Sequence, residues 1–142
     1  ALQTEYLHSK GATITAQDTI LDTCYNKVVR HISTVSKPVL EKLHAQYPMV
    51  LVTNFYGNMH TVLAEFGLDH LFKEVVESAV VGVRKPDPEI FRLGVAALGL
   101  QPQETLMIGD SLEKDILPAQ SMGCQTFQIT PSSSLNSLPL RP

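Results

Sequence analysis

Short apolar runs alternate with amphipathic segments along most of the chain. Two continuous apolar runs, residues 49–52 and 106–108, are bounded by turn residues, a pattern that predicts buried strands. Two further strands are predicted at the valine-rich residues 74–81 and at residues 124–129. Strands that are buried on both faces are typical of a parallel sheet flanked by helices.

Helical periodicity fills the intervals between these runs. It predicts helices at residues 36–47, 58–66, 88–98 and 115–122. Ser36 is expected to cap the first of them, and Asp87 the third, in which Pro88 takes the first helical position. Gly94 would let that third helix lie close to a strand. The repeated helix–strand order predicts an α/β fold with a parallel sheet covered on both faces.

The two ends of the chain carry no candidate chemistry. Residues 1–35 are expected to be helical, since apolar side chains recur there every four residues from Ile20 to Ile32. The last segment, residues 131–142, contains four serines and three prolines and is expected to be a flexible tail.

Composition excludes several classes of protein. The 142 residues predict one domain, and the 44% hydrophobic content suffices for a packed core. With a formal charge of −3 and no run of Lys or Arg, nucleic acid is not an expected partner. No apolar run is long enough to predict a membrane span. Cys24 and Cys124 have no metal-ligand spacing and are expected to be free thiols in a reducing cytoplasm.

Polar residues follow three of the predicted strands in a complementary set. Thr53 and Asn54 follow the first, Lys85 follows the second, and Asp110 and Asp115 follow the third. Because the ligand of an open α/β sheet lies beyond the carboxyl ends of its strands, these residues form a candidate site. Hydroxyl, N–H and lysine groups suit a phosphate, and two carboxylates suit Mg²⁺.

Each of these residues also has an ordinary structural interpretation. Thr53 could simply end a strand, and Lys85 could be a solvated loop residue. Asp110 could be a turn residue, and Asp115 a helix cap. These alternatives stay open on residue type alone, but the order and spacing of the set favour a site for phosphoryl transfer.

Three segments carry a family resemblance: VLVTN at 50–54, GVRKPDPEIF at 82–91 and MIGDSLEKD at 107–115. They resemble the second, third and fourth motifs of the haloacid dehalogenase (HAD) superfamily, and most closely its phosphoglycolate phosphatases and nucleotidases. The resemblance covers residues 36–130. It implies a HAD-like Rossmannoid three-layer sandwich with a parallel sheet, in which residues 1–35 are the C-terminal part of a helical cap.

The resemblance also implies a role for each residue of the set. Catalytic roles go to Thr53, whose hydroxyl would bind the phosphoryl group with help from the Asn54 backbone, and to Lys85, which would hold the phosphate and the attacking carboxylate together. Asp110 would ligate Mg²⁺. Asp115 would be a second ligand or a partner just outside the metal's ligands.

One motif of the family is missing from this chain. The family's first motif, an apolar strand followed by DxDx(T/V), supplies the nucleophilic aspartate. No such string occurs in the 142 residues. In the family, that strand lies in the middle of the sheet, between the strands of the second and fourth motifs, so the first core strand is expected to be absent and two strand edges to be unpaired.

These features predict a Mg²⁺-dependent phosphomonoester hydrolase that acts on a small phosphorylated metabolite. The chain is expected to be the C-terminal portion of a longer or nicked polypeptide, inactive alone, with the missing segment cut off or carried on a second chain. An alternative is a non-catalytic HAD-like binding or regulatory domain. A third is another reaction on the same scaffold, such as carbon–halogen hydrolysis or phosphomutase chemistry, although the aspartate pair favours metal-dependent phosphate chemistry.

Overall fold

The computed structural model describes residues 26–133 and 137–138. The chain divides into two compact units, Ala1–Pro38 and Val39–Pro142. The predictions for residues 1–25, in the expected cap, and for most of the expected tail therefore lie outside the described residues. Within the described ranges, every helix falls short of the length and apolarity that crossing a membrane would need.

The described part of the first unit is helical. Helix α3 (Lys27–His31) is followed by the π-helical turn η2 (Ile32–Ser36). The prediction that Ser36 caps a new helix is wrong, because Ser36 ends η2 and Lys37 is itself helical (φ −60°, ψ −46°). Pro38 lacks the N–H that an α-helix would use at that position, and the wider π turn directly precedes it.

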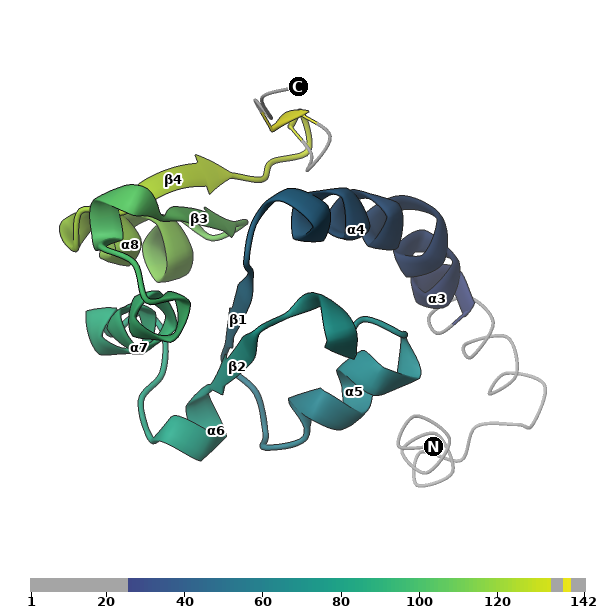
Figure 1. The fold of residues 1–142 in the computed structure, drawn as a ribbon, viewed down its shortest axis with the longest axis horizontal. Helices are drawn as coiled ribbons and strands as arrows, with labels where there is room; N and C mark the ends of the chain where they lie inside the picture. The colour runs from purple at the N-terminus through teal and green to yellow at the C-terminus, as the bar shows by residue number, and fades with distance from the viewer. Residues whose placement is uncertain (1–25, 134–136, 139–142) are drawn as a thin grey trace, which may run out of the picture. The chain divides into compact units, whose positions relative to one another are not determined.

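The remaining elements alternate between helices and strands (Figure 1). They are α4 (Lys37–Gln46), β1 (Val50–Thr53), α5 (Met59–Glu65), η3 (Asp69–Leu71), β2 (Glu74–Glu77), α6 (Ser78–Val81), α7 (Pro88–Leu98), η4 (Pro102–Glu104), β3 (Leu106–Gly109), η5 (Leu112–Ile116), α8 (Leu117–Ser121) and β4 (Gln125–Gln128). This order, with the pairing described next, confirms an α/β fold with parallel strands.

The strands form two parallel pairs. β1 pairs with β2, with Thr53 opposite Glu77, and β3 pairs with β4, with Gly109 opposite Gln128. Among the described residues the pairs make two separate sheets. All four residues of β1 are half-buried, so the prediction that this strand is buried on both faces is wrong. The reason is that β1 has a strand neighbour along only one edge within the described ranges.

The predicted strand at residues 74–81 is half strand and half helix. It ends at Glu77, and Ser78–Val81 forms α6, which Gly82 closes in the left-handed conformation (φ 77°). Valines favour strands, but β1 ends opposite Glu77 and leaves the next residues no partner to pair with. Val80 is consequently 70% exposed.

Two predicted helix starts have different outcomes. The Asp87 cap of α7 is confirmed, since its side chain accepts a 2.9 Å hydrogen bond from the Glu89 N–H and Pro88 begins the helix. The prediction that helix begins again near Asp115 is wrong. Helical turns begin at Leu112, because the Ser111 hydroxyl accepts from the Lys114 N–H at 3.1 Å and caps η5.

Helices cover both faces of the strand pairs. On one face, α7 and α8 bury Ile90, Phe91 and Ala119 with Val76, against the partly buried Val50, Val52 and Met107. On the other face, Val39 and Leu43 of α4 pack with Met49, Ile108 and Phe127. The close approach predicted at Gly94 is confirmed: a Cβ there would lie 2.9 Å from the Val52 Cγ2.

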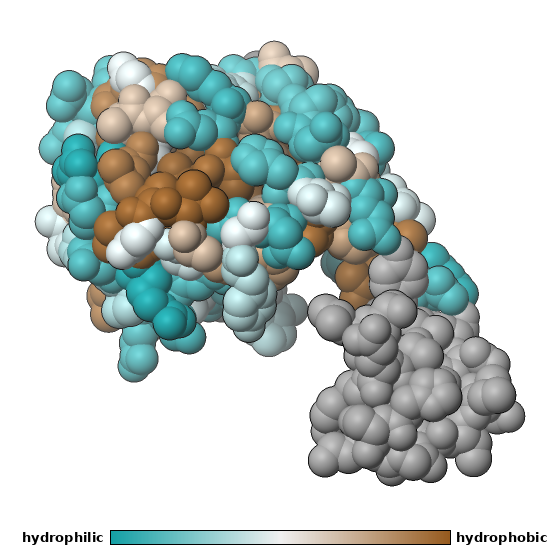
Figure 2. Space-filling model, turned by 90° about the horizontal axis from the view of Figure 1, so that it is seen from below, coloured by the Kyte–Doolittle hydropathy of each residue, from teal (hydrophilic) through white to brown (hydrophobic). Residues whose placement is uncertain are grey.

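An apolar hollow lies between β1 and β3. Its walls include Val50 and Val52 of β1, Leu106 and Met107 of β3, and α7 around Gly94. Its volume, about 70 Å³, is well below the several hundred cubic ångströms of a typical small-molecule pocket. Hydrophobic side chains also gather on the outer surface, in one area of the face that Figure 2 shows, with hydrophilic residues around it.

Candidate functional site

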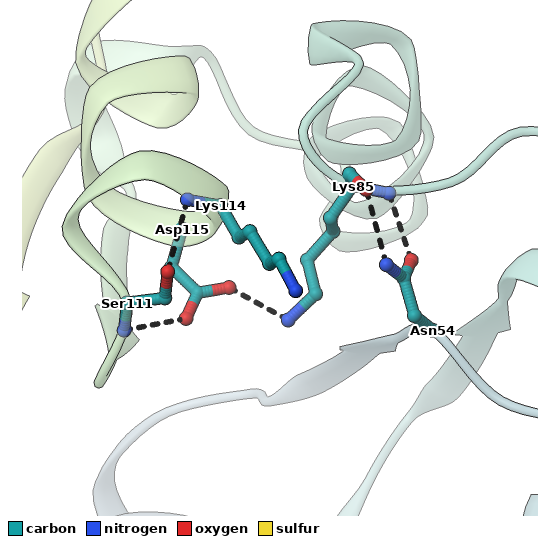
Figure 3. Close-up of polar contacts among 5 residues, drawn as sticks. All are labelled: Asn54, Lys85, Ser111, Lys114 and Asp115. Atoms are coloured by element: carbon teal, nitrogen blue, oxygen red, sulfur yellow. Dashed lines mark hydrogen bonds and ion pairs between the residues drawn. The ribbon is translucent and has the colours of Figure 1, made fainter.

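Lys85 forms the centre of the candidate site. Its Nζ lies 2.6 Å from Oδ1 of Asp115, and the two side chains are 17% and 3% exposed (Figure 3). The ion pair joins the loop after α6 to η5, which follows β3. Burying a carboxylate is costly unless the group is paired or hydrogen-bonded, and the Lys85 ammonium group supplies this pairing for Asp115.

Asn54 fixes the loop that carries Lys85. Its side-chain amide donates to the Lys85 carbonyl at 3.0 Å, and its Oδ1 accepts from the Lys85 N–H at 2.8 Å. The Lys85–Pro86 peptide bond is cis. The sequence assigned Asn54 through its backbone, so this side-chain role was missed. Asn54, Lys85 and Asp115 are therefore brought together by direct contacts.

Asp115 is held at both carboxylate oxygens. Lys85 binds Oδ1, and the Ser111 N–H donates to Oδ2 at 3.1 Å. The carboxylate lies against the backbone of β3 because position 109 is glycine: a Cβ there would be 2.5 Å from the Asp115 Cβ and 2.6 Å from its Oδ2. Gly109 thus makes room for the ion pair.

Gly109→Ala should destabilise the protein by about 1–3 kcal/mol, because the new methyl group must displace Asp115 and the start of η5. Urea denaturation measures the change. Gly82→Ala is the control, since it adds a methyl group at a glycine with no neighbouring atom within 4 Å and reports only the cost of a positive φ. A Gly109→Ala protein as stable as the wild type would show that Asp115 does not depend on this gap.

Thr53 and Asp110 lie at the carboxyl ends of β1 and β3. Thr53 is half-buried and Asp110 is exposed. The Asp110 carbonyl accepts a 3.2 Å bond from the Gln128 side chain. Within the described ranges, neither the Thr53 hydroxyl nor the Asp110 carboxylate has a protein partner. Both groups can therefore bind a ligand, although no direct contact ties either side chain to the Lys85–Asp115 pair.

The donor set fits part of a magnesium site. Mg²⁺ prefers oxygen ligands and near-octahedral geometry. Asp110 offers a carboxylate with no partner, whereas both oxygens of Asp115 are already engaged. The described residues contain no group of three or more Asp, Glu, His or Cys that could hold a metal ion. Asp110 fits a metal ligand, and Asp115 fits a residue that positions its surroundings.

A buried glutamate near the site was not predicted. Glu77, at the carboxyl end of β2 opposite Thr53, is 1% exposed. Its carboxylate accepts from the N–H groups of Gly57 and Met59, which follow Thr53 and Asn54 in the chain. The available signal was a second glutamate at the far end of a short strand whose two middle residues are valines.

Comparisons with protein-family models and with curated proteins identify the same family. The model of the haloacid dehalogenase-like hydrolases matches residues 6–123. Among curated relatives, a glyceraldehyde 3-phosphate phosphatase of Methanopyrus kandleri is 43% identical over 67 residues, 47% of this chain and 29% of that protein. A phosphoserine phosphatase of Thermus thermophilus is 44% identical over 82 residues, 57% of this chain and 33% of that protein. The chain thus spans about a third of the length of these relatives.

Solved structures agree with the sequence comparison. A HAD phosphatase from Thermococcus onnurineus has a TM-score of 0.64 and 33% identity, covering 68% of this chain and 46% of that chain. The HAD-hydrolase YfnB from Bacillus subtilis, described as bound to magnesium, has a TM-score of 0.63 and 29% identity, covering 68% of this chain and 43% of that chain. With the family model matching most of its residues, the chain belongs to the haloacid dehalogenase-like hydrolases.

Proposed function

We propose that the protein is a Mg²⁺-dependent phosphatase that hydrolyses a phosphomonoester of a small metabolite. The observation that carries the proposal is the contact set of Asn54, Lys85 and Asp115, which joins the loop after β1, the loop after α6 and the helical turn η5. The relatives named above are phosphatases of small phosphorylated molecules, which supports the same substrate class.

In this proposal, Lys85 holds the substrate phosphate. An ammonium group has three N–H donors, and Asp115 occupies one of them. The remaining two are available for a phosphate oxygen and for the attacking carboxylate. Asp115 keeps the ammonium group oriented while the site is empty, so little reorganisation is needed when the anion arrives.

Thr53 and the backbone after it would complete the phosphate site. The Thr53 hydroxyl, without a partner in the described part of the chain, donates to a second phosphate oxygen. The Asn54 N–H contributes a further donor, while its side chain keeps the Lys85 backbone in place. Together these groups would fix the phosphoryl group for in-line attack.

Asp110 would hold the metal ion, with Asp115 beside it. When bound, Mg²⁺ neutralises negative charge on the phosphate and on the attacking carboxylate. Further ligands would come from the substrate, water and the segment that carries the nucleophile, since the described residues bring no three Asp, Glu, His or Cys side chains together.

The nucleophile would come from a strand seated between β1 and β3. The apolar hollow there has Val50 and Val52 on one wall and Leu106 and Met107 on the other. An added parallel strand would pair with both edges and complete a HAD-like three-layer sandwich, with residues 36–130 as its core and residues 1–35 as part of a cap. Its DxDx(T/V) motif would end beside Thr53 and Asp110, and a segment outside these 142 residues would supply it.

The test is hydrolysis of p-nitrophenyl phosphate by the complete protein. Activity should disappear with EDTA and return when Mg²⁺ is added in excess, because the metal would neutralise charge in the transition state. Ca²⁺ is the control ion, since it is larger and tolerates irregular coordination. A complete protein that binds neither phosphate nor Mg²⁺ would favour the alternative, a non-catalytic domain that has kept the fold.

A further inference from the structure

Glu77 is a buried carboxylate with no role in the proposed chemistry. It is 1% exposed, and its Oε1 accepts from the Gly57 N–H at 2.5 Å. The Met59 N–H lies 3.4 Å from each of its carboxylate oxygens. No ion pair to Glu77 occurs within the part of the chain that the structure describes. Among the described residues, backbone N–H groups are therefore the partners of this carboxylate.

These N–H groups belong to the loop that leaves the candidate phosphate site. Residues 54–58 connect β1 to α5, and Met59 is the first residue of α5. Asn58, at the N-cap position, makes no side-chain cap. Glu77 serves that function from the neighbouring strand through the Met59 N–H, since the first N–H groups of a helix lack partners within the helix. Its shorter contact, with the Gly57 N–H, holds the loop just before the N-cap.

Ser78 binds the same loop two residues earlier. Its hydroxyl lies 3.1 Å from the Phe55 nitrogen, which donates to it, and 3.3 Å from the Phe55 carbonyl, to which it donates. The last residue of β2 and the first residue of α6 therefore engage Phe55, Gly57 and Met59. The Glu77–Ser78 pair, named here the loop clamp, spans nearly the whole β1–α5 connection.

The clamp is tied directly to the strand that carries Thr53. Glu77 lies opposite Thr53 in the β1–β2 register, so the clamp and the candidate phosphate ligands share one end of one sheet. A loop between a strand end and a helix start has many backbone conformations open to it, and each hydrogen bond to the clamp removes some of them. The conformation of the backbone after Thr53 thus depends on Glu77.

We propose that Glu77 and Ser78 are positioning residues that hold the β1–α5 loop in the conformation that binds the phosphate of the substrate. This inference rests on the proposed phosphatase function. Neither residue contacts the phosphate. The clamp acts through Phe55, Gly57 and Met59, whose backbone fixes the Thr53 hydroxyl and the Asn54 N–H.

The test compares Glu77→Gln with Glu74→Gln in the complete protein. The Glu77→Gln change keeps the size of the side chain but removes the charge, whereas Glu74 is an exposed residue at the start of the same strand. Hydrogen exchange of the loop amides should accelerate in Glu77→Gln and stay unchanged in Glu74→Gln. Inorganic phosphate should inhibit Glu77→Gln at least about tenfold more weakly, with kcat/KM lowered by a similar factor.

Ser78→Ala provides a second, milder variant if Glu77→Gln does not fold. It removes one hydroxyl and should accelerate exchange at Phe55 while weakening inhibition by phosphate several-fold. If phosphate inhibits both variants as strongly as the wild type, and their loop amides exchange at the wild-type rate, the proposed role of the clamp is wrong. Faster loop exchange without weaker inhibition would overturn it too, since the loop would then not position the ligands. If the wild-type protein shows neither phosphatase activity nor binding of phosphate, the proposed function itself is wrong. The wild type alone gives this result, so it is distinguishable from failure of the clamp.

Discussion

Lys85→Met is expected to lower the free energy of unfolding by about 3–5 kcal/mol, the usual cost of removing one partner of a buried ion pair. The Asp115 side chain is 3% exposed and would lose its only cation, keeping the Ser111 N–H as its one remaining partner among the described residues. The same variant should lose phosphatase activity at least about a hundredfold, because Lys85 is the proposed phosphate ligand.

A double variant separates the two effects. Lys85→Met/Asp115→Leu removes both charges, so stability should return toward the wild-type value while activity stays lost. Denaturant unfolding and kcat/KM for p-nitrophenyl phosphate are the measurements. Arg84→Met, which removes an exposed positive charge one residue away, is the control and should leave both unchanged. An activity loss below about tenfold in Lys85→Met would demote Lys85 to a structural residue.

Asp110→Asn is expected to nearly abolish activity, by about a thousandfold or some 4 kcal/mol in the barrier, while leaving the fold intact. The carboxylate is exposed and has no protein partner among the described residues, so its loss costs little stability. The amide has one neutral oxygen to offer a hard cation, so binding of Mg²⁺ should weaken.

Isothermal titration with Mg²⁺ and the dependence of activity on Mg²⁺ concentration measure this effect. Glu113→Gln is a matched control, because it makes the same acid-to-amide change at an exposed residue three positions further along. Wild-type Mg²⁺ affinity in Asp110→Asn would remove Asp110 from the metal site. Equal losses in both variants would point to the general negative charge of this loop instead.

The sequence predicted helix and strand boundaries well where a local interaction within a few residues decided them. Asp87 and Pro88 begin α7 as expected, because a side-chain cap and a fixed φ act locally. The prediction was wrong at residues 78–81, where valine favours a strand but the partner strand has already ended. It was also wrong at Ser36, whose capping chemistry is overridden by helical backbone on both sides.

The site was predictable as a group of residues but not as a set of contacts. Strand ends gave the neighbourhood of Lys85 and Asp115, and the structure joins them. Their direct ion pair was not predicted, because residue type alone cannot decide whether a carboxylate faces a metal ion or a lysine. Glu77 was missed for a related reason: the sequence shows a glutamate at a strand end but not which backbone N–H groups it will bind.

The absence of a side chain at Gly94 has a consequence for how this protein tolerates mutation. Every missense change of a glycine codon introduces a residue that has at least a Cβ. That atom would lie 2.9 Å from Cγ2 of Val52, the residue directly before Thr53. Missense variants at position 94 would therefore displace Val52 and with it the strand that presents Thr53. A substitution in α7 would in this way weaken phosphate binding, although Gly94 itself is not part of the candidate site.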